Sequence, residues 1–563
     1  MAHMKKSIGV FLTCYSLTIF ATTSTVYFNG DILTMEGDAP NYVESVLVQD
    51  NKITYAGAVK DVLARAGSNP TFHDLKGHTL MPGFIDTWGH FTLVAQDMLA
   101  VNLAYFSKAP PKTKVDLIEK LRHEGKPFNG WIVGTGYAPT MITGGQLTLA
   151  DLDKAFPTQP VLIANISTLE GLVNSAGLKK LGITKNTKAT AGYIVVDPKT
   201  CALTGEIVGN PFFDAVSKAV GSYSQDQMFE TYRQAEKVYT SNGFTTVQSY
   251  QASPVDIDNM RQAVAKGIVK VDLIALPYFN VVDQLLKADP HYPFGLYSQG
   301  DRGFKVAGML MPTDGGPQLR IAYFTQPYQD TSGYSKDWRG MALYPQSLID
   351  YYAKLAYQNN IQYFAYSNGD AGIDMTLAAL NKAINETGVK DDRRTVIAHS
   401  YFSRDDQLVQ YKDKHIMMLT LPNQVWLYGD LYLKILGENR ASNMAPLAAA
   451  QKYGVKTGLH NDSPGSGPNV FFTIWSAVNR KTYSGVALGP DQRIDPYLAL
   501  QGVTSNAAYE YKEEAIKGTI TAGKVADLIE LDRNPLKVDP DSIKDVRVLQ
   551  TIKGGKQLYV NGL

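Results

Sequence analysis

The stretch "LMPGFIDTWGHF", residues 80–91, gives the clearest indication of the fold. Leu80 to Ile85 is a short apolar run of the kind that forms a buried β-strand, and Asp86 follows it. His90 comes four residues later, two positions after Trp88. Barrel enzymes place their chemistry, metal ligands included, at the C-terminal ends of parallel strands. The stretch therefore predicts a first barrel strand with His90 at the rim.

The middle of the chain repeats this arrangement of an apolar strand followed by a helical pattern. The candidate strands are "WIVGTGY", "PVLIANIS", "FTTVQSY", "VDLIALPYF", "FKVAGMLM", "QYFAYS", "TVIAHS", "IMMLTLP" and "VKTGLHND". A strand and a helix repeated about eight times are typical of a barrel of parallel strands. For residues 81–509 we predict an α/β fold, a distorted TIM-type (β/α)8 barrel with inserts.

The two ends of the chain differ from this middle part. Residues 25–80 and 510–563 are rich in short β-segments punctuated by turns, which predicts one small β-sandwich built from both ends. Residues 1–24 combine a cloning remnant, Met1 to His3, with a basic start and a short apolar run typical of a secretion signal. An exported, periplasmic protein is expected, although the apolar run is also compatible with a buried first strand or helix.

Composition narrows the class of protein. With 54 basic and 53 acidic residues among 563, the chain has a net charge of +1 and no basic footprint for nucleic acid. One of its two cysteines, Cys14, lies in the predicted signal, so neither a disulfide framework nor a cysteine metal cluster is expected. We expect a small-molecule ligand and no membrane span in the mature chain, and a homo-oligomer is left open.

Polar or aromatic side chains follow most of the candidate strands. They are His90, Asp314, Tyr366, His399, Gln424, Trp426, His460 and Asp462. A single histidine in such a place is more often structural than functional. Three histidines and two carboxylates on one rim form a candidate active site, because a barrel brings its strand ends together.

Several motifs resemble the amidohydrolase superfamily. They are "GFTTVQ", "NGDAGIDMTL", "VIAHSYFSRDDQ", "LHNDSPGSGPN" and the terminal "KGTITAGKVADLIELDRNPL". The branch that they resemble most contains N-substituted formamide deformylase, and the resemblance covers nearly all of the chain after the signal. It implies a distorted barrel beside a β-sandwich and hydrolysis of C–N bonds with one or two divalent metals.

Compared residue by residue with that family, the metal ligands are only partly kept. The retained ligands are His90, His399 and Asp462. Other residues occupy the remaining expected positions: Trp88, Leu310 and Tyr366 stand at ligand positions, and Ala138, Leu169 and Gln424 stand near the substrate. Indole and aliphatic side chains do not bind such metals. The resemblance thus implies that the two-metal centre is lost.

From these survivors we predict metal-independent acid–base catalysis without a cofactor, by His399 with Tyr366 or by His90 with Asp462, and with His460 as a further catalytic candidate. Cyclisation, isomerisation or elimination of a small aromatic or apolar molecule fits this chemistry. The residues expected to bind it, largely as an aromatic wall, are Trp88, Tyr137, Asp314, Gln424, Trp426 and Tyr428.

Two alternatives stay open at this point. His90, His399 and Asp462 could hold one divalent metal, zinc or similar, in a hydrolase of C–N bonds. The replaced ligands could instead only fill the space of a lost metal, in a non-catalytic protein that binds a ligand.

Overall fold

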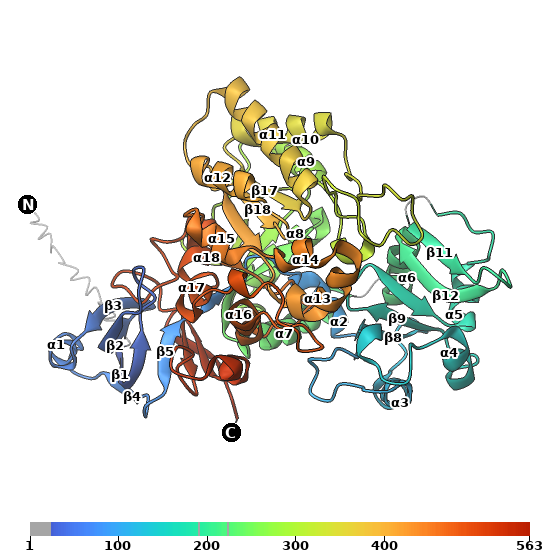
Figure 1. Ribbon diagram of the computed structural model, residues 1–563. Coiled ribbons are helices and arrows are strands. Elements are labelled where there is room, and N and C mark those ends of the chain that lie inside the picture. The colour runs from blue at the N-terminus through green and yellow to red at the C-terminus, as the bar shows by residue number, and fades with distance from the viewer. Residues whose placement is uncertain (1–23, 190–191, 222–223, 563) are drawn as a thin grey trace, which may run out of the picture.

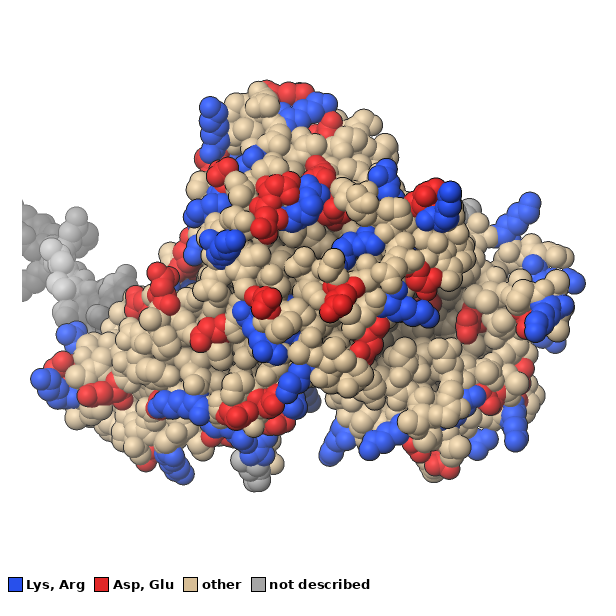
Figure 2. Space-filling view, in the orientation of Figure 1, with Lys and Arg blue, Asp and Glu red and all other residues tan. Residues whose placement is uncertain are grey.

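The computed structural model describes residues 24–189, 192–221 and 224–562, and Figure 1 traces them from blue at the N-terminus to red at the C-terminus. Except for Ser24, the predicted signal lies outside the described residues and stays a prediction. Within the described ranges, no helix combines the length and apolar character that crossing a bilayer requires. Figure 2 shows basic and acidic side chains interspersed on one face of the molecule, in keeping with the net charge of +1.

The two β-rich chain ends lie in one sheet of eight described strands, here called the terminal sheet. Its order is β23-β22-β21-β5-β1-β2-β3, with β4 beside β1. The strands are β1 (Ser24–Leu33), β2 (Tyr42–Gln49), β3 (Lys52–Gly57), β4 (Thr71–Asp74), β5 (Thr79–Pro82), β21 (Leu528–Leu531), β22 (Val548–Lys553) and β23 (Lys556–Val560), and α1 is Val59–Arg65. Strand β21 runs antiparallel to β5, with Ile529 opposite Met81, so this pairing joins residues more than 400 positions apart.

The middle of the chain contributes two sheets in which every strand pair is parallel, here called the central sheets. The first has the order β15-β14-β13-β6 and the second β16-β17-β18-β19-β20. The strands are β6 (Phe84–Ile85), β13 (Phe244–Tyr250), β14 (Asp272–Leu276), β15 (Phe304–Val306), β16 (Gly308–Pro312), β17 (Gln362–Ser367), β18 (Val396–His399), β19 (Met417–Thr420) and β20 (Thr457–Leu459).

Contacts link the central sheets at both of their edges. Tyr278 and Leu310 form a parallel bridge between the segments after β14 and in β16. At the opposite edges, Thr87 Oγ1 after β6 donates to the carbonyl of Leu459 in β20, at 3.2 Å. Nearly all strand residues are buried, as expected for parallel strands that are covered on both faces.

Helices follow most of the central strands and cover them on the outside (Figure 1). They are α2 (Phe91–Asp97), α7 (Gln225–Thr240), α8 (Pro254–Ala265), α9 (Phe279–Ala288), α10 (Gln346–Gln358), α11 (Asp370–Thr387), α12 (Asp405–Asp413), α13 (Asn423–Leu436), α14 (Glu438–Ser442), α15 (Leu447–Lys452), α16 (Val470–Asn479), α17 (Pro496–Gln501) and α18 (Ser505–Glu510). The largest group of buried apolar side chains lies between these helices and the sheets, for example Tyr239 in α7 and Phe244 in β13.

A third group of strands forms a separate insert sheet, seen at the right of Figure 1. Its order is β11-β12-β10-β9-β8-β7, with β7 (Val101–Asn102), β8 (Ile132–Tyr137), β9 (Val161–Asn165), β10 (Glu170–Val173), β11 (Gly192–Val196) and β12 (Leu203–Gly209). Its helices are α3 (Lys114–Glu124), α4 (Leu149–Ala155), α5 (Ser175–Leu181) and α6 (Asn210–Val220). The prediction that "WIVGTGY" and "PVLIANIS" belong with the central strands is wrong, because they are β8 and β9 of this sheet.

A buried charge network ties the central strands to the terminal sheet. Asp272, the first residue of β14, accepts from Lys517 and from Lys553 of β22, each at 2.5 Å. Lys553 also contacts Asp527 at 2.7 Å. Burial opposes the ionisation of Asp272, but the two lysines outweigh it and lower the pKa of this carboxyl to about 2.

Candidate functional site

The turn after β6 places His90. Asp86, fully buried, accepts a hydrogen bond from the main-chain N–H of Gln248, and burial raises the pKa of its carboxyl to about 7. A Cβ on Gly89 would lie 2.0 Å from Asp86 Oδ2, so the turn has room only for glycine. The N–H of His90 then donates to the carbonyl of Ser463, at 3.0 Å, which brings this turn against the segment after β20.

His90 and Asp462 meet where these two segments join. Nε2 of His90 lies 3.3 Å from Oδ1 of Asp462. Burial opposes ionisation of Asp462, but this hydrogen bond and the neighbouring histidines His399 and His460 hold the pKa of its carboxyl well below the usual range. Asp462 is therefore a carboxylate at neutral pH, next to three imidazoles.

His399 and His460 are buried beside this pair. Their ring centroids are 5.0 Å apart. Among the residues that the structure describes, the ring nitrogens of His399 have no hydrogen-bond partner, and those of His460 have none apart from an interaction with the main chain of Trp88. Burial lowers the pKa of His399 to about 4 and that of His460 well below its ordinary value, so both rings are neutral near pH 7. Buried nitrogens without partners cost free energy unless a ligand satisfies them.

The side chain of Trp88 packs against this group of residues. Its side chain is fully buried, and its ring centroid lies 4.4 Å from Tyr250, 5.5 Å from His399 and 6.1 Å from Tyr366, with which it stacks. The ring of Tyr366 lies 4.4 Å from that of His399. The structure thus brings Trp88, His90, Tyr366, His399, His460 and Asp462 together, as the strand-end pattern predicts.

Two further aromatic residues, Tyr250 and Tyr401, belong to this group and were not predicted from the sequence. Tyr250 ends β13, and its ring lies 4.9 Å from that of His90. Tyr401, two residues after β18, lies 4.9 Å from His399. The available signal was the position of each tyrosine at or just after a candidate strand, in "FTTVQSY" and in "TVIAHSY".

A small cavity opens onto the His90–Asp462 pair. Its volume is about 40 Å³, and its lining residues are His90, Ile166, Ser167, Thr168, Gln318, Gln424, Tyr428, Asp462 and Gly465. Most of these side chains are polar. Of the aromatic residues predicted to bind the ligand, Tyr428 lines this cavity in the described structure, whereas Trp88 packs against Tyr250, Tyr366 and His399.

Three predicted binding residues lie away from the cavity. Tyr137 ends β8 in the insert sheet, and its hydroxyl accepts from the N–H of Leu147. Trp426 packs on Tyr105, 5.0 Å between centroids. Asp314 is fully buried and accepts from main-chain N–H groups, including that of Gly369 at 2.8 Å, so it shapes the turn after β17. The strand-end pattern located these residues but could not show where their side chains point.

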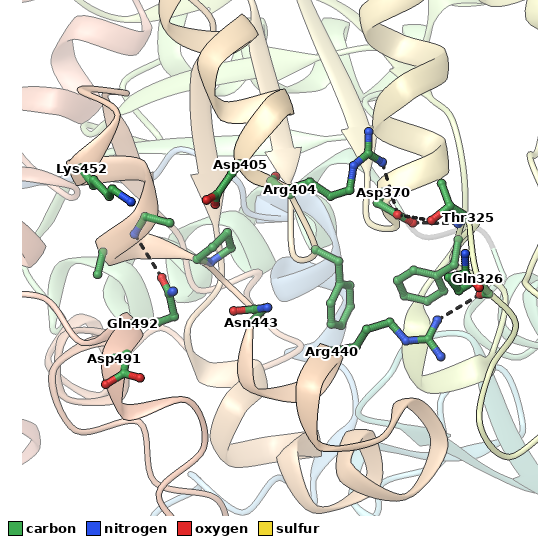
Figure 3. A pocket seen from close by; sticks show the side chains of 16 residues that line it. Thr325, Gln326, Asp370, Arg404, Asp405, Arg440, Asn443, Lys452, Asp491 and Gln492 are labelled. Atoms are coloured by element: carbon green, nitrogen blue, oxygen red, sulfur yellow. Dashed lines mark hydrogen bonds and ion pairs between the residues drawn. The ribbon is translucent and has the colours of Figure 1, made fainter.

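A larger cleft of about 730 Å³ lies elsewhere on the surface (Figure 3). None of the predicted site residues lines it. Its polar side chains largely bind one another: Asp370 accepts from Thr325 Oγ1 at 2.5 Å and pairs with Arg404 at 3.3 Å, while Arg440 donates to main-chain carbonyls such as that of Gln326. This cleft is separate from the histidine site.

No group of three or more His, Cys, Asp and Glu side chains in the described ranges is already arranged around a common metal position. At the site, the hydrogen bond between His90 and Asp462 occupies one atom of each. The donor types at this place, imidazole nitrogen and carboxylate oxygen, are nevertheless those that zinc and similar ions take.

Comparison with known proteins shows the family. Residues 71–559 match the amidohydrolase family, so the chain belongs to it. N-substituted formamide deformylase of Arthrobacter pascens is 24% identical over 530 residues, covering 92% of this chain and 95% of that protein. Two solved structures, uncharacterized metal-dependent hydrolases of Pyrococcus furiosus and Pyrococcus horikoshii, have TM-scores of 0.71 and 0.72 at 21% and 22% identity, and they cover 91% and 92% of this chain and 100% and 99% of their own.

These relatives confirm the resemblance to the amidohydrolases and show the same overall fold. They contradict the prediction that the protein needs no cofactor, because both structures of that fold are described as metal-dependent hydrolases. The predicted loss of the metal centre is therefore not supported.

Proposed function

We propose that this protein hydrolyses a C–N bond of a small organic molecule with one divalent metal ion, held by His90, His399 and Asp462. The observation that carries the proposal is the group of buried imidazoles beside the Asp462 carboxylate, in which the ring nitrogens of His399 have no hydrogen-bond partner among the described residues. Membership of the amidohydrolase family and the likeness to a formamide deformylase support the same reaction class.

The donor types of these residues suit a single ion. In the described part of the chain both nitrogens of His399 are free of hydrogen bonds and the ring is neutral, so the nitrogen without a proton can donate its lone pair to a metal in either tautomer. Asp462 supplies a negative oxygen, and His460 places another neutral imidazole 5.0 Å from His399 between ring centroids. The stacked ring of Trp88 and the aliphatic side chain of Leu310, both fully buried, offer no ligand for a second ion.

The chain's own residues hold and enclose the substrate. Ser167, Thr168, Gln424 and Tyr428 offer neutral hydrogen-bonding groups around the cavity, which suits an uncharged amide. A cavity of about 40 Å³ holds only a compact head group, so the remainder of the molecule must extend outward or the lining must open. An ion of this kind supplies Lewis-acid polarisation of a carbonyl oxygen.

We also propose the finer architecture that the sequence predicts. The edge contacts between the central sheets support their closure into a (β/α)8 barrel. The pairing of β5 with β21 supports one β-sandwich domain made of residues 25–80 and 510–563. Export to the periplasm is proposed on the predicted signal alone.

The proposal is tested by hydrolysis of a panel of N-substituted formamides and acetamides, with the protein supplied with zinc, manganese or no metal. We expect release of the amine only with metal, and a loss of at least 100-fold in kcat/KM for His399→Ala and for Asp462→Ala. His291→Ala, at an exposed position after α9, is the control and should match the wild type. Equal turnover of an amide with and without a chelator would contradict the proposal.

A further inference from the structure

The amide of Gln424 is held in one orientation by a second residue of the same helix. Gln424 is in the first turn of α13, directly after β19, and its side chain is buried except where it lines the small cavity. The hydroxyl of Tyr432 donates to Oε1 of Gln424, at 2.8 Å. Residues 424, 428 and 432 are spaced at four-residue intervals, so they share one face of α13.

Tyr432 is a reliable donor in this pair. It is fully buried, and burial raises the pKa of its hydroxyl well above the ordinary value, so the proton stays on the oxygen. A glutamine side chain has one acceptor oxygen and one NH₂ group with two donors. With Oε1 satisfied by Tyr432, the NH₂ group is the end of the amide left for the cavity. In the described part of the chain, Nε2 of Gln424 makes no hydrogen bond.

Gln424 and the His90–Asp462 pair line the same small cavity. Because the hydrogen bond from Tyr432 occupies Oε1 of Gln424, the NH₂ group is the donor that meets a ligand in this cavity.

We propose that Gln424 Nε2 donates a hydrogen bond to the carbonyl oxygen of the substrate, and that Tyr432 is its positioning residue. The site thereby selects molecules that present a compact carbonyl acceptor, such as a formyl or another small acyl amide, at the His90–Asp462 pair. This inference rests on the proposed hydrolysis for its reaction, but the recognition of a carbonyl group is separable from turnover.

The test uses the full chain loaded with metal and N-propylformamide as the probe. For Gln424→Met we expect kcat/KM to fall on the order of 100-fold, with a lower kcat and a higher KM, as when a donor to the substrate carbonyl and to the developing oxyanion is removed. Tyr432→Phe should lower kcat about 10-fold, and the double variant should be no worse than Gln424→Met alone, because the hydroxyl acts only through the amide.

Gln358→Met is the matched control, since Gln358 is exposed at the end of α10 and is not among the residues that line the cavity. It should retain kcat within about 3-fold. A loss in Gln358→Met equal to that in Gln424→Met would overturn the inference, and so would unchanged kcat in both Gln424→Met and Tyr432→Phe. Unfolding midpoints of all variants separate these effects from loss of the fold.

A measurement of substrate binding distinguishes failure of the inference from failure of the proposed function. Calorimetric titration of N-propylformamide should give a weaker Kd for Gln424→Met than for the wild type. If the wild type binds the formamide in this Gln424-dependent way but hydrolyses nothing, the recognition stands and the proposed function fails. If it hydrolyses the formamide without dependence on Gln424, the inference fails and the function stands. Absence of both binding and hydrolysis overturns the inference.

Discussion

At the scale of single residues, the sequence indicated which residues lie at the site, because the ends of parallel strands meet there. Five site residues could be located from the sequence because each lies at or after the end of a buried strand, and parallel strands end on one side. They are His90, Tyr366, His399, His460 and Asp462. The direction in which each side chain points could not be predicted, because it depends on the geometry of the turn after the strand. Asp314 shows this clearly: it follows a strand like the others, yet its carboxylate binds main-chain N–H groups inside the fold.

Gly89 provides a sharp test of the turn that holds His90. A methyl group at this position would collide with the Asp86 carboxylate, which is fixed by its own hydrogen bond to Gln248. Gly89→Ala should lower the free energy of unfolding by about 1–3 kcal/mol, as overpacking of a buried position does. Gly562→Ala, with open space around its Cβ position, is the control. Equal denaturant midpoints for the two variants would contradict this description of the turn.

Trp88 tests the packing beneath the histidines. Its indole is fully buried among Tyr250, Tyr366 and His399. Trp88→Ala should cost about 3–5 kcal/mol in the free energy of unfolding, the range for removal of a large buried ring. Trp88→Phe should cost less, since it leaves a smaller void. Urea denaturation followed by circular dichroism measures both, and a wild-type stability for Trp88→Ala would refute the packing role.

At the scale of elements, the period of the apolar residues predicted most central strands but not their sheet. β8 and β9 read like barrel strands because both are short and apolar, and nothing local reveals that they pair within the insert sheet. The ends of helices depend on neighbouring residues in the sequence and are therefore easier to predict. α8 begins with Ser253, Pro254 and Asp256, and the structure shows the corresponding capping box.

The α8 cap gives a prediction at this scale. Ser253 Oγ accepts from the N–H of Asp256 at 3.2 Å, and Asp256 Oδ2 accepts from the N–H of Ser253 at 3.0 Å. Ser253→Ala should destabilise the protein by about 1 kcal/mol, while Ser253→Asp should retain most of the stability because aspartate also caps helices. Thermal unfolding of the two variants should rank them in this order, and the reverse order would count against the cap.

At the scale of the whole molecule, pairings between distant segments decide the architecture. The similar composition of the two chain ends indicated that they combine, and β5 and β21 do pair. The charges that fasten this sheet to the central strands could not be foreseen, because Asp272, Lys517 and Lys553 are far apart in sequence and look like ordinary surface residues. They are buried and meet only in the folded chain.

This network predicts an acid dependence of stability. The folded-state pKa of Asp272, about 2, lies below its ordinary value of 3.8, so its contribution to stability is present above about pH 4 and is lost as the pH falls toward 2. Asp272→Asn should destabilise the protein by about 3–5 kcal/mol at pH 7, because each of two buried lysines loses one of its carboxylate partners, and should flatten the loss of stability below pH 4. Glu386→Gln, which breaks an exposed pair with Lys354, is the control and should change little. An unchanged pH profile in Asp272→Asn would contradict the assignment.

The central claim is that one metal ion occupies the histidine site, and elemental analysis of the purified protein tests it most directly. After purification without chelator, followed by dialysis against a trace of zinc, we predict about one divalent ion per chain in the wild type. His399→Ala and Asp462→Ala should contain far less, while His291→Ala should equal the wild type. A wild-type protein that holds no metal under these conditions, or variants that hold as much as the wild type, would contradict the account.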